Sequence, residues 1–292
     1  MRKGKNKKLT FIDLFAGIGG FHLAFHNLGA ECVFASEWNQ HARKTYEYNF
    51  KKISPKIFES GNFEGDITKV NEKEIPDFDI LTGGFPCQPF SHAGYKKGFS
   101  ETRGTLFFDI VRILREKKPV AFFIENVSHL LKHDNRKTFE VIKDTIENEL
   151  GYSFHYKLVR GTDFNIPQYR SRLFMVGFRD KNIPFKFPEP IPLKKTMSDI
   201  FGEECSRKIG FTLRVGGRGS GLHDRRNWDA YLVGGKERRL GIEEGKKMMG
   251  FPKNYKFPVT ESQAMKQLGN AVVVPAIQAV AKRIIETLKK YS

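Results

Sequence analysis

Short apolar segments alternate with helical patterns over roughly the first 180 residues, and this alternation constrains the fold more than any other feature. Runs typical of strands lie at 9–15, 31–37, 79–83, 120–124, 153–159 and 173–178. Helical patterns lie between them at 19–28, 39–49, 105–117 and 135–150. Strands that alternate with helices indicate an α/β fold with a mostly parallel sheet. Because ligands bind beyond the carboxyl ends of such strands, we expect the chemistry in the loops after Phe15, Glu37, Gly83 and Ile124.

The composition and the pattern of the chain change near residue 182. Four prolines between Pro184 and Pro192 break the helical rhythm, as expected of a linker. Residues 205–239 are rich in glycine and carry nine Lys and Arg against three Asp and Glu. Helical patterns return afterwards, and we expect the last one, 273–290, to dock on the first domain. We therefore predict a large domain at 1–182, completed by a C-terminal helix within 265–292, and a small domain with a hinge at 183–264.

Composition excludes several classes of protein. With 39% hydrophobic and 28% charged residues, the chain is neither wholly disordered nor a disulfide scaffold. We read no signal peptide or anchor in the basic N-terminus and no apolar run of the roughly 18 residues that a membrane helix needs. Three cysteines, Cys32, Cys87 and Cys205, are too few and too scattered for a disulfide framework or a zinc site. We expect a cytoplasmic protein with no metal and no membrane contact.

The net charge is strongly positive. Fifty Lys and Arg residues against 33 Asp and Glu residues give +17. Such a charge indicates a polyanionic partner, with nucleic acid the first candidate. The frequent Lys, Phe, Ile and Asn residues also fit an AT-rich genome, so charge alone leaves both explanations open.

A strand runs into a glycine-rich turn at Phe11–Gly20 and the turn opens a helix. Glycines there allow a ligand to approach the backbone closely. Glu37 follows Gly17 by 20 residues, at the end of the second strand, where a carboxylate can bind the hydroxyls of a ribose. Trp38 offers a ring face to a purine, although a lone tryptophan is more often a core aromatic. Asp66 is placed to accept a hydrogen bond from an exocyclic amine.

The details of this turn favour a cationic nucleoside over a dinucleotide. The pattern G-x-G-x-x-G needs a third glycine where His22 stands. Asp13 lies at the mouth of the loop, where a carboxylate suits a positive charge better than a pyrophosphate. S-adenosylmethionine carries adenine, ribose, a sulfonium and an ammonium, and so matches each feature.

Three further groups follow predicted strands. Cys87 lies between prolines in Gly83–Ser91, and this setting at the ligand edge favours a nucleophile over a structural thiol, the role we assign to Cys32 and Cys205. Glu125 comes directly after an apolar strand, as a loop-start acid or as a general acid. Arg170 and Arg172 alternate in a strand-like run, so both should lie on one face and clamp an anion, unless the run is a solvated edge strand.

These motifs occur in one order along the chain: DLFAGIGG, SEWN, GDIT, GGFPCQPFS, ENV, QYRSR, RLGIEEGKKMMGFP and QLGNAVVVP. In this order they resemble the C5-cytosine DNA methyltransferases of bacterial restriction–modification systems. The resemblance covers nearly the whole chain except about 182–235. It implies a Rossmann-like S-adenosylmethionine-dependent methyltransferase domain with a smaller target-recognition domain. It also implies methyl transfer to C5 of a flipped-out cytosine in a short, specific duplex DNA site.

The resemblance assigns roles to individual residues. Cys87 would add to C6 of cytosine, Glu125 would hold N3 and the exocyclic amine, and Arg170 and Arg172 would support Glu125, the base and the catalytic loop. The cofactor would be lined by Phe15, Gly17, Gly19, Glu37, Trp38, Asp66, Ile67, Pro86, Leu106, Asn270, Ala271 and Val272. DNA would be contacted by Gln88, Ser91 and Arg103 in a loop that closes over it, and by Arg214, Arg218, Arg225 and Arg226 in the variable segment, either at guanines or at phosphates only.

Two other functions remain open at this point. A related branch of the family methylates transfer RNA, and a catalytically silent relative would bind DNA as a repressor does. The arginine-rich variable segment favours duplex DNA, and the intact set of Cys87, Glu125, Arg170 and Arg172 favours catalysis. We also expect a monomer in the bacterial cytoplasm, associated with the nucleoid through DNA, and a cognate endonuclease that acts on the same site without a stable complex.

Overall fold

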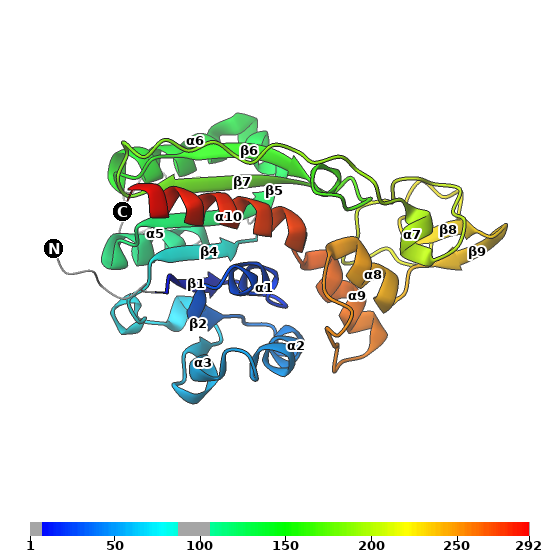
Figure 1. Cartoon of the computed structure of the whole chain (residues 1–292), viewed down its shortest axis with the longest axis horizontal. Coiled ribbons are helices and arrows are strands. Elements are labelled where there is room, and N and C mark those ends of the chain that lie inside the picture. Colours follow the sequence, from blue (N-terminus) through cyan, green and yellow to red (C-terminus); the bar gives the residue numbers. More distant parts are fainter. Residues whose placement is uncertain (1–7, 87–105, 292) are drawn as a thin grey trace.

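The computed structural model describes residues 8–86 and 106–291, and its centre is a seven-stranded sheet of order β3-β2-β1-β4-β5-β7-β6 (Figure 1). The strands are β1 Thr10–Leu14, β2 Glu31–Ser36, β3 Phe63–Glu64, β4 Ile80–Gly84, β5 Ala121–Val127, β6 His155–Arg160 and β7 Ser171–Phe178. The first five pair in parallel, whereas β7 runs antiparallel to both β5 and β6. The predicted Rossmann-like α/β fold is confirmed.

Alternate side chains of each strand enter two separate cores. In β5, Phe123 packs on one face of the sheet, while Phe122 and Ile124 pack on the other. This period of two follows from the strand geometry and explains why the central strands read as continuous apolar runs. The first core is shared with α1 Gly20–Asn27, α2 Gln40–Phe50, α3 Pro55–Glu59 and α10 Val274–Tyr291, and the second with α5 Leu106–Lys117 and α6 Lys137–Asp144.

The connecting segments hold short helical turns as well. They are η1 Ile67–Lys69, η2 Glu72–Glu74, η3 Ser128–Leu131, η4 His133–Arg136, η6 Gly161–Asp163 and the π-helical turn η5 Thr145–Glu149. The helix predicted at 135–150 is therefore α6 continued by a π turn, and it begins after three residues with positive φ, Asp134, Asn135 and Arg136.

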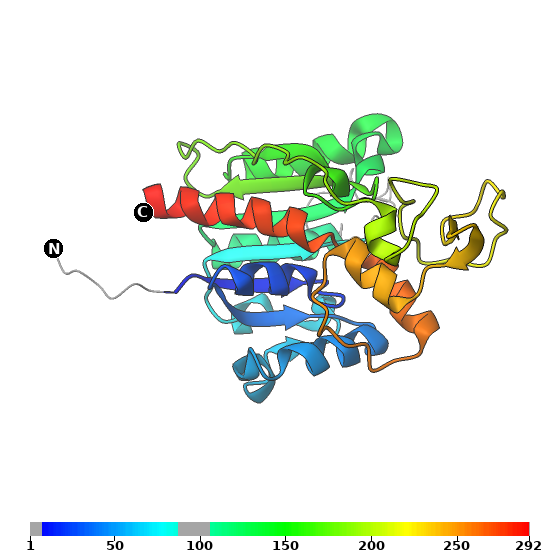
Figure 2. The same ribbon diagram turned by 45° about the vertical axis from the view of Figure 1, so that its right-hand side comes forward.

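The C-terminal helix α10 docks on α1, as its apolar stripe predicts (Figure 2). A Cβ on Gly20 would lie 2.4 Å from Cγ2 of Val272, so only glycine allows the segment before α10 to reach the start of α1. The α9–α10 span Glu261–Tyr291 corrects one expectation, because by length and composition it could cross a membrane. Its apolar window is 67% buried inside the protein, as in the core helix of a folded domain.

A smaller group of elements lies beyond the carboxyl ends of the parallel strands (Figures 1 and 2). It comprises α7 Met197–Phe201, the hairpin of β8 Ala230–Val233 and β9 Lys236–Arg239, α8 Ile242–Met249 and α9 Glu261–Asn270. Buried side chains of this group, among them Trp228, Tyr231 and Met248, join the same core cluster as α1 and α10. The two parts therefore meet through an apolar contact at the edge where the ligands were expected.

A buried histidine replaces the third glycine of the dinucleotide pattern. His22 is fully buried, with Nδ1 2.5 Å from the hydroxyl of Tyr46 and Nε2 2.9 Å from Oγ of Ser54. Burial, together with the nearby His26, lowers the pKa of His22 well below its usual value. The folded protein therefore holds this imidazole neutral.

This neutral imidazole predicts a pH dependence of stability. The unfolded chain protonates His22 below about pH 6.5 and the folded chain does not, so the stabilisation is complete above that pH and is lost as the pH falls through it. Between pH 6.5 and 5, His22→Asn should reduce the slope of the unfolding free energy against pH by up to about 1.4 kcal/mol per pH unit. Urea titrations at several pH values measure this slope. The exposed His41→Asn should keep the wild-type slope, and an unchanged slope in His22→Asn would contradict the prediction.

Candidate active site

The glycine loop after β1 adopts a backbone that few residues tolerate. Phe15, Gly17 and Gly19 have φ of +54°, +55° and +77°, all in the left-handed region. Such a conformation is uncommon for a phenylalanine and marks a strained loop of the kind found at ligand sites. At Gly19 a side chain is also excluded, because a Cβ would lie 2.2 Å from the ring of Phe50. The loop therefore exposes backbone at the carboxyl end of β1.

Glu37 ties the ends of β1 and β2 together. One carboxylate oxygen accepts the N–H of Gly17 at 2.8 Å and the other accepts the N–H of Asn39 at 2.8 Å. Burial raises the pKa of Glu37, while these N–H groups and Arg43 act in the opposite direction. Trp38, the next residue, is 74% exposed, so the alternative that it is a core aromatic is wrong. A fixed carboxylate beside an open indole is the arrangement that a ribose with an attached purine needs.

An unpaired carboxylate oxygen lies beside this loop. Asp13 is buried, its Oδ2 accepts the N–H of His22 at 3.2 Å, and its Oδ1 has no partner among the described residues. Burial raises the pKa of Asp13 well above its usual value. A cationic ligand nearby would offset the cost of a buried carboxylate, so the residues present fit S-adenosylmethionine better than an anionic cofactor.

The other residues predicted to line the cofactor come from four places in the fold. Asp66 Oδ1 caps η1 by accepting the N–H and hydroxyl of Thr68, and Ile67 is buried behind it. Pro86 is exposed after β4, and Leu106 opens α5. Asn270 is exposed at the end of α9, and Ala271 and Val272 pack toward the start of α1.

The buried acid Glu125 ends β5 and is held by a charged partner from β7. Arg172 Nε lies 2.9 Å from Oε1 of Glu125, which is 8% exposed. The antiparallel register pairs Val127 with Arg172 and Glu125 with Phe174, which places Arg172 diagonally across from the acid. Burial raises the pKa of Glu125, while Arg172 and Arg170 act to lower it. The result is a carboxyl that takes up a proton more readily than an exposed one.

Two neighbours of Glu125 shape the start of the cysteine loop, and sequence reasoning did not single them out. Gly84 pairs with Glu125 in the sheet, and a Cβ there would lie 3.2 Å from Oε2. Asn126 is buried and donates from Nδ2 to the carbonyl of Phe85 at 2.9 Å. Gly84 belongs to the motif GGFPCQPFS and Asn126 to the motif ENV, so membership of these motifs was the sequence signal that could have identified them. Cys87, Gln88, Ser91 and Arg103 lie outside the described residues.

Arg170 has partners different from those expected. It lies before β7, not within it, and its guanidinium donates to the carbonyls of Leu213, Gly269 and Ala271 at 3.1, 2.9 and 2.7 Å. Burial, with Arg172 nearby, lowers the pKa of Arg170 to about 9, which leaves it charged at neutral pH. The hydrogen bonds therefore divide the two roles: Arg172 holds the acid, while Arg170 joins the sheet to the segments at residues 213, 269 and 271. Support of Glu125 by Arg170 stays a prediction.

The four arginines of the variable segment have different surroundings. Arg218 contacts Asp229 and Glu261, and Arg226 contacts Asp224. Arg214 and Arg225 are exposed. Contact with DNA stays a prediction for all four.

A strained glycine loop, a fixed carboxylate beside an exposed indole and a buried acid lie at one edge of a Rossmann-like sheet, as expected of a group-transfer enzyme with a nucleoside cofactor. The sequence profile of the C-5 cytosine-specific DNA methylases matches residues 9–214 and 215–286. The chain belongs to this family. It is an S-adenosylmethionine-dependent DNA cytosine-5 methyltransferase of the kind found in type II restriction–modification systems.

Similar proteins span the whole chain. The type II methyltransferase M.HhaI of Haemophilus parahaemolyticus is 43% identical over 97% of this chain and 97% of its own. M.HpaII of Haemophilus parainfluenzae is 40% identical over 97% of this chain and 90% of its own. The crystal structure of Schizosaccharomyces pombe Dnmt2 has a TM-score of 0.71 at 20% identity, covers 96% of this chain and 99% of its own, and shows the likeness of fold.

The close approach of Gly84 to Glu125 predicts that Gly84→Ala slows methyl transfer. The added methyl group must push the carboxylate by a few tenths of an ångström, which we expect to lower kcat about tenfold, since a 1 Å displacement costs about a hundredfold. Single-turnover assays with saturating DNA and cofactor measure the effect. Gly221→Ala, whose new methyl group would meet nothing within 4 Å, serves as the control. Equal rates for Gly84→Ala and wild type would show that the position of this carboxylate does not matter.

Proposed function

We propose that Cys87 is the nucleophile that adds to C6 of a flipped-out cytosine in a short, specific duplex DNA site, with Glu125 as its acid partner. The observation that carries the proposal is the buried Glu125–Arg172 pair at 2.9 Å, located at the carboxyl end of β5. Parallel pairing sets this end beside β4, which Cys87 follows by three residues in sequence. The acid, the end of β4 and the glycine loop after β1 therefore share one edge of the sheet, and this supports the assignment of the nucleophile to the segment that follows β4.

The chemistry requires both groups. Cytosine C5 is too weak a nucleophile to accept a methyl group directly. Addition of the Cys87 thiolate to C6 makes C5 resemble an enamine carbon, and Glu125 assists by donating a proton or hydrogen bond to N3. The raised pKa of Glu125 favours the protonated form that can donate. C5 would then accept the methyl group that S-adenosylmethionine supplies. Loss of the C5 proton to water, return of the N3 proton to Glu125 and departure of the Cys87 sulfur from C6 restore the aromatic ring.

The predicted cofactor residues would hold S-adenosylmethionine along the edge formed by β1, β2 and β4. Bound there, S-adenosylmethionine supplies an electrophilic methyl group on a sulfonium. Glu37 would accept hydrogen bonds from ribose hydroxyls, and Trp38 would stack on the adenine. Asp13 and the backbone of Phe15 and Gly17 would face the positively charged part of the cofactor.

Duplex DNA would lie between the sheet edge and the small group of elements at 183–264, which we propose as the target-recognition domain. A base inside a duplex cannot be reached, so flipping is needed, at a cost of a few kcal/mol. Phosphate contacts by the +17 chain would offset this cost. We propose that the enzyme acts as a monomer in the cytoplasm, bound to the nucleoid, and that a cognate endonuclease shares its site.

Removal of the exposed indole tests the cofactor site. Trp38→Ala should raise the Kd for S-adenosylmethionine about tenfold, because stacking of a base on an aromatic ring is worth roughly 1–3 kcal/mol. Isothermal titration calorimetry without DNA measures this Kd. Tyr48→Ala removes an exposed aromatic of α2, the helix that follows Trp38, and should bind the cofactor as the wild type does. Equal Kd values for Trp38→Ala and wild type would remove Trp38 from the cofactor site.

Cys87→Ser tests the nucleophile. The variant should transfer no methyl group to duplex DNA yet should still bind DNA and S-adenosylmethionine, whereas Cys205→Ser, at a buried thiol, should remain active. The wild type should form a covalent adduct with a duplex whose target carries 5-fluorocytosine, because fluorine cannot leave C5 as a proton does. Peptide mapping should place this adduct on Cys87.

The same assay separates the alternatives. Turnover in Cys87→Ser or an adduct on another residue would overturn the assignment of the nucleophile. Transfer to transfer RNA with none to duplex DNA would overturn the proposed substrate.

A further inference from the structure

The four arginines predicted to contact DNA from the variable segment are held in different ways. We infer that Arg214 reads a guanine next to the target cytosine and that Arg218 is a positioning residue that does not read a base. The inference rests on the proposed function and deepens it by separating the residue that sets specificity from its neighbours.

The residue before Arg214 is fixed at both of its backbone polar groups. The N–H of Leu213 donates to Oε1 of Gln168 at 3.1 Å, and the carbonyl of Leu213 accepts from Nη1 of Arg170 at 3.1 Å. Gln168 and Arg170 are 0% and 3% exposed, so neither side chain is free to move with solvent. The QYRSR motif thus anchors the recognition segment directly before Arg214.

The backbone of Arg214 itself lies against the end of α9. A Cβ on Gly269 would lie 2.5 Å from the carbonyl oxygen of Arg214 and 2.9 Å from the nitrogen of Val215. Arg170 also donates to the carbonyl of Gly269 at 2.9 Å. The backbone at Arg214 is therefore held by three buried residues, Gln168, Arg170 and Gly269, next to the predicted cofactor segment that starts at Asn270.

The backbone of Arg214 lies close to the proposed base pocket, and the Arg214 side chain is available to bind DNA. Arg170, which clamps Leu213, lies two residues before Arg172, and Nε of Arg172 is 2.9 Å from Oε1 of Glu125, the proposed base-holding acid. Arg214 is exposed and, among the described residues, makes no hydrogen bond or ion pair. A rigid backbone with a free guanidinium is what bidentate reading of guanine O6 and N7 requires.

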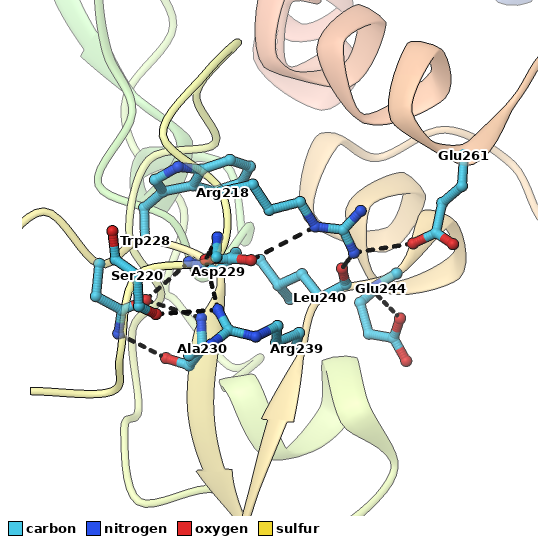
Figure 3. A network of polar contacts seen from close by, with 12 residues as sticks. Arg218, Ser220, Trp228, Asp229, Ala230, Arg239, Leu240, Glu244 and Glu261 are labelled. Atoms are coloured by element: carbon cyan, nitrogen blue, oxygen red, sulfur yellow. Dashed lines mark hydrogen bonds and ion pairs between the residues drawn. The ribbon is translucent and has the colours of Figure 1, made fainter. Parts of the chain in front are cut away.

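Arg218 is committed to a network around a buried acid (Figure 3). Asp229 is 0% exposed; its Oδ1 accepts from Nη1 of Arg239 at 3.2 Å, and its Oδ2 lies 3.4 Å from Nε of Arg218. Nη2 of Arg218 also donates to the carbonyl of Leu240 at 2.7 Å and to Glu261 at 2.8 Å. To contact a base, Arg218 would have to leave a buried carboxylate with one partner fewer.

Arg218 therefore fixes the shape of its loop and does not read a base. It joins the loop that contains Gly219 to β9 through Asp229 and Arg239, and to α9 through Glu261. The indole of Trp228 adds a second attachment by donating to the carbonyl of Gly216 at 3.0 Å. The loop after Arg214 is therefore shaped by contacts within the protein.

Among the described residues, no contact holds Arg225 or Arg226 against α9 or the sheet as Arg214 is held. Arg226 forms an exposed ion pair with Asp224 at 2.7 Å, two residues away, and Arg225 is exposed beside it. The pair is bidentate, with Nη2 2.7 Å from Oδ2 and Nε 3.1 Å from Oδ1 of Asp224, but Arg226 is on the surface, where a phosphate can approach its guanidinium. These two arginines suit contacts with phosphate, which strengthen binding to every sequence alike.

The test uses full-length enzyme and a pool of duplex DNA with a randomised sequence. Methylated sites are identified by bisulfite sequencing, and the DNA retained by the enzyme is sequenced in parallel. In both Arg214→Ala and Arg214→Lys, discrimination at one guanine next to the methylated cytosine should fall roughly tenfold to a hundredfold, with the other positions unchanged. Lysine keeps the charge for a phosphate but cannot bond to guanine as the planar guanidinium does.

Matched variants separate reading from positioning. Arg218→Ala should lower the melting temperature and DNA affinity with the consensus unchanged, and Arg218→Lys should restore part of the melting temperature. Arg225→Ala should weaken binding to all sequences alike. The inference is overturned if the wild-type consensus has no guanine beside the target, if Arg214→Lys keeps the full consensus, or if Arg218→Ala relaxes one base position without changing the melting temperature.

Failure of the proposed function gives a different result. A wild type that methylates no duplex DNA overturns that function, while the consensus of the retained DNA still decides the role of Arg214. If Arg214→Ala has a lower melting temperature than the wild type, the consensus of Arg214→Lys is compared with that of the wild type.

Discussion

The buried carboxyl of Glu125 is the group on which the rest of the structure depends. An acid at this depth is costly unless a charged partner accompanies it, and removing one partner of such a pair costs about 3–5 kcal/mol. Arg172 reaches Glu125 only because β7 reverses direction beside β5, and Gly84 leaves the space that the second carboxylate oxygen occupies. The antiparallel strand is therefore part of the site as well as of the sheet. The same burial that makes the acid costly raises its pKa toward the range in which it can donate a proton.

A second interaction connects the remaining parts of the molecule. Arg170 donates to the carbonyls of Leu213, Gly269 and Ala271, so one buried guanidinium joins the sheet, the segment before Arg214 and the C-terminal helices. Gly20 and Gly269 permit the same three parts to approach at backbone distance. Such contacts transmit a shift in one part to the others, because close-packed interiors have little room to absorb it.

Much of the fold was readable from the sequence because its signals are local. The apolar run at 31–37 became β2, and the stripe at 273–290 became α10, within one or two residues. The positions of Glu37, directly after β2, and of Asp66, directly before η1, could be predicted for the same reason, while their contact with a cofactor stays a prediction. The exposure of Trp38 and the antiparallel direction of β7 were not readable, since each depends on residues distant in the chain. The hairpin of β8 and β9 turns at Gly234 and Gly235, a local signal that the sequence analysis did not use. The arginines of 205–239 looked alike, because composition carries no information about which carboxylate each one meets.

The sequence by itself determined the order of the motifs, the α/β class and the chemical groups available: a glycine loop, a carboxylate after the second strand, a cysteine between prolines and an acid after an apolar strand. These follow from spacing along the chain, which is set by bond geometry and by the periods of helix and strand. Only the tertiary structure decided how those groups are used. Arg172 pairs with Glu125, Arg170 turns to the hinge and Arg218 turns to Asp229, because the position of each guanidinium is set by which segments pack beside it.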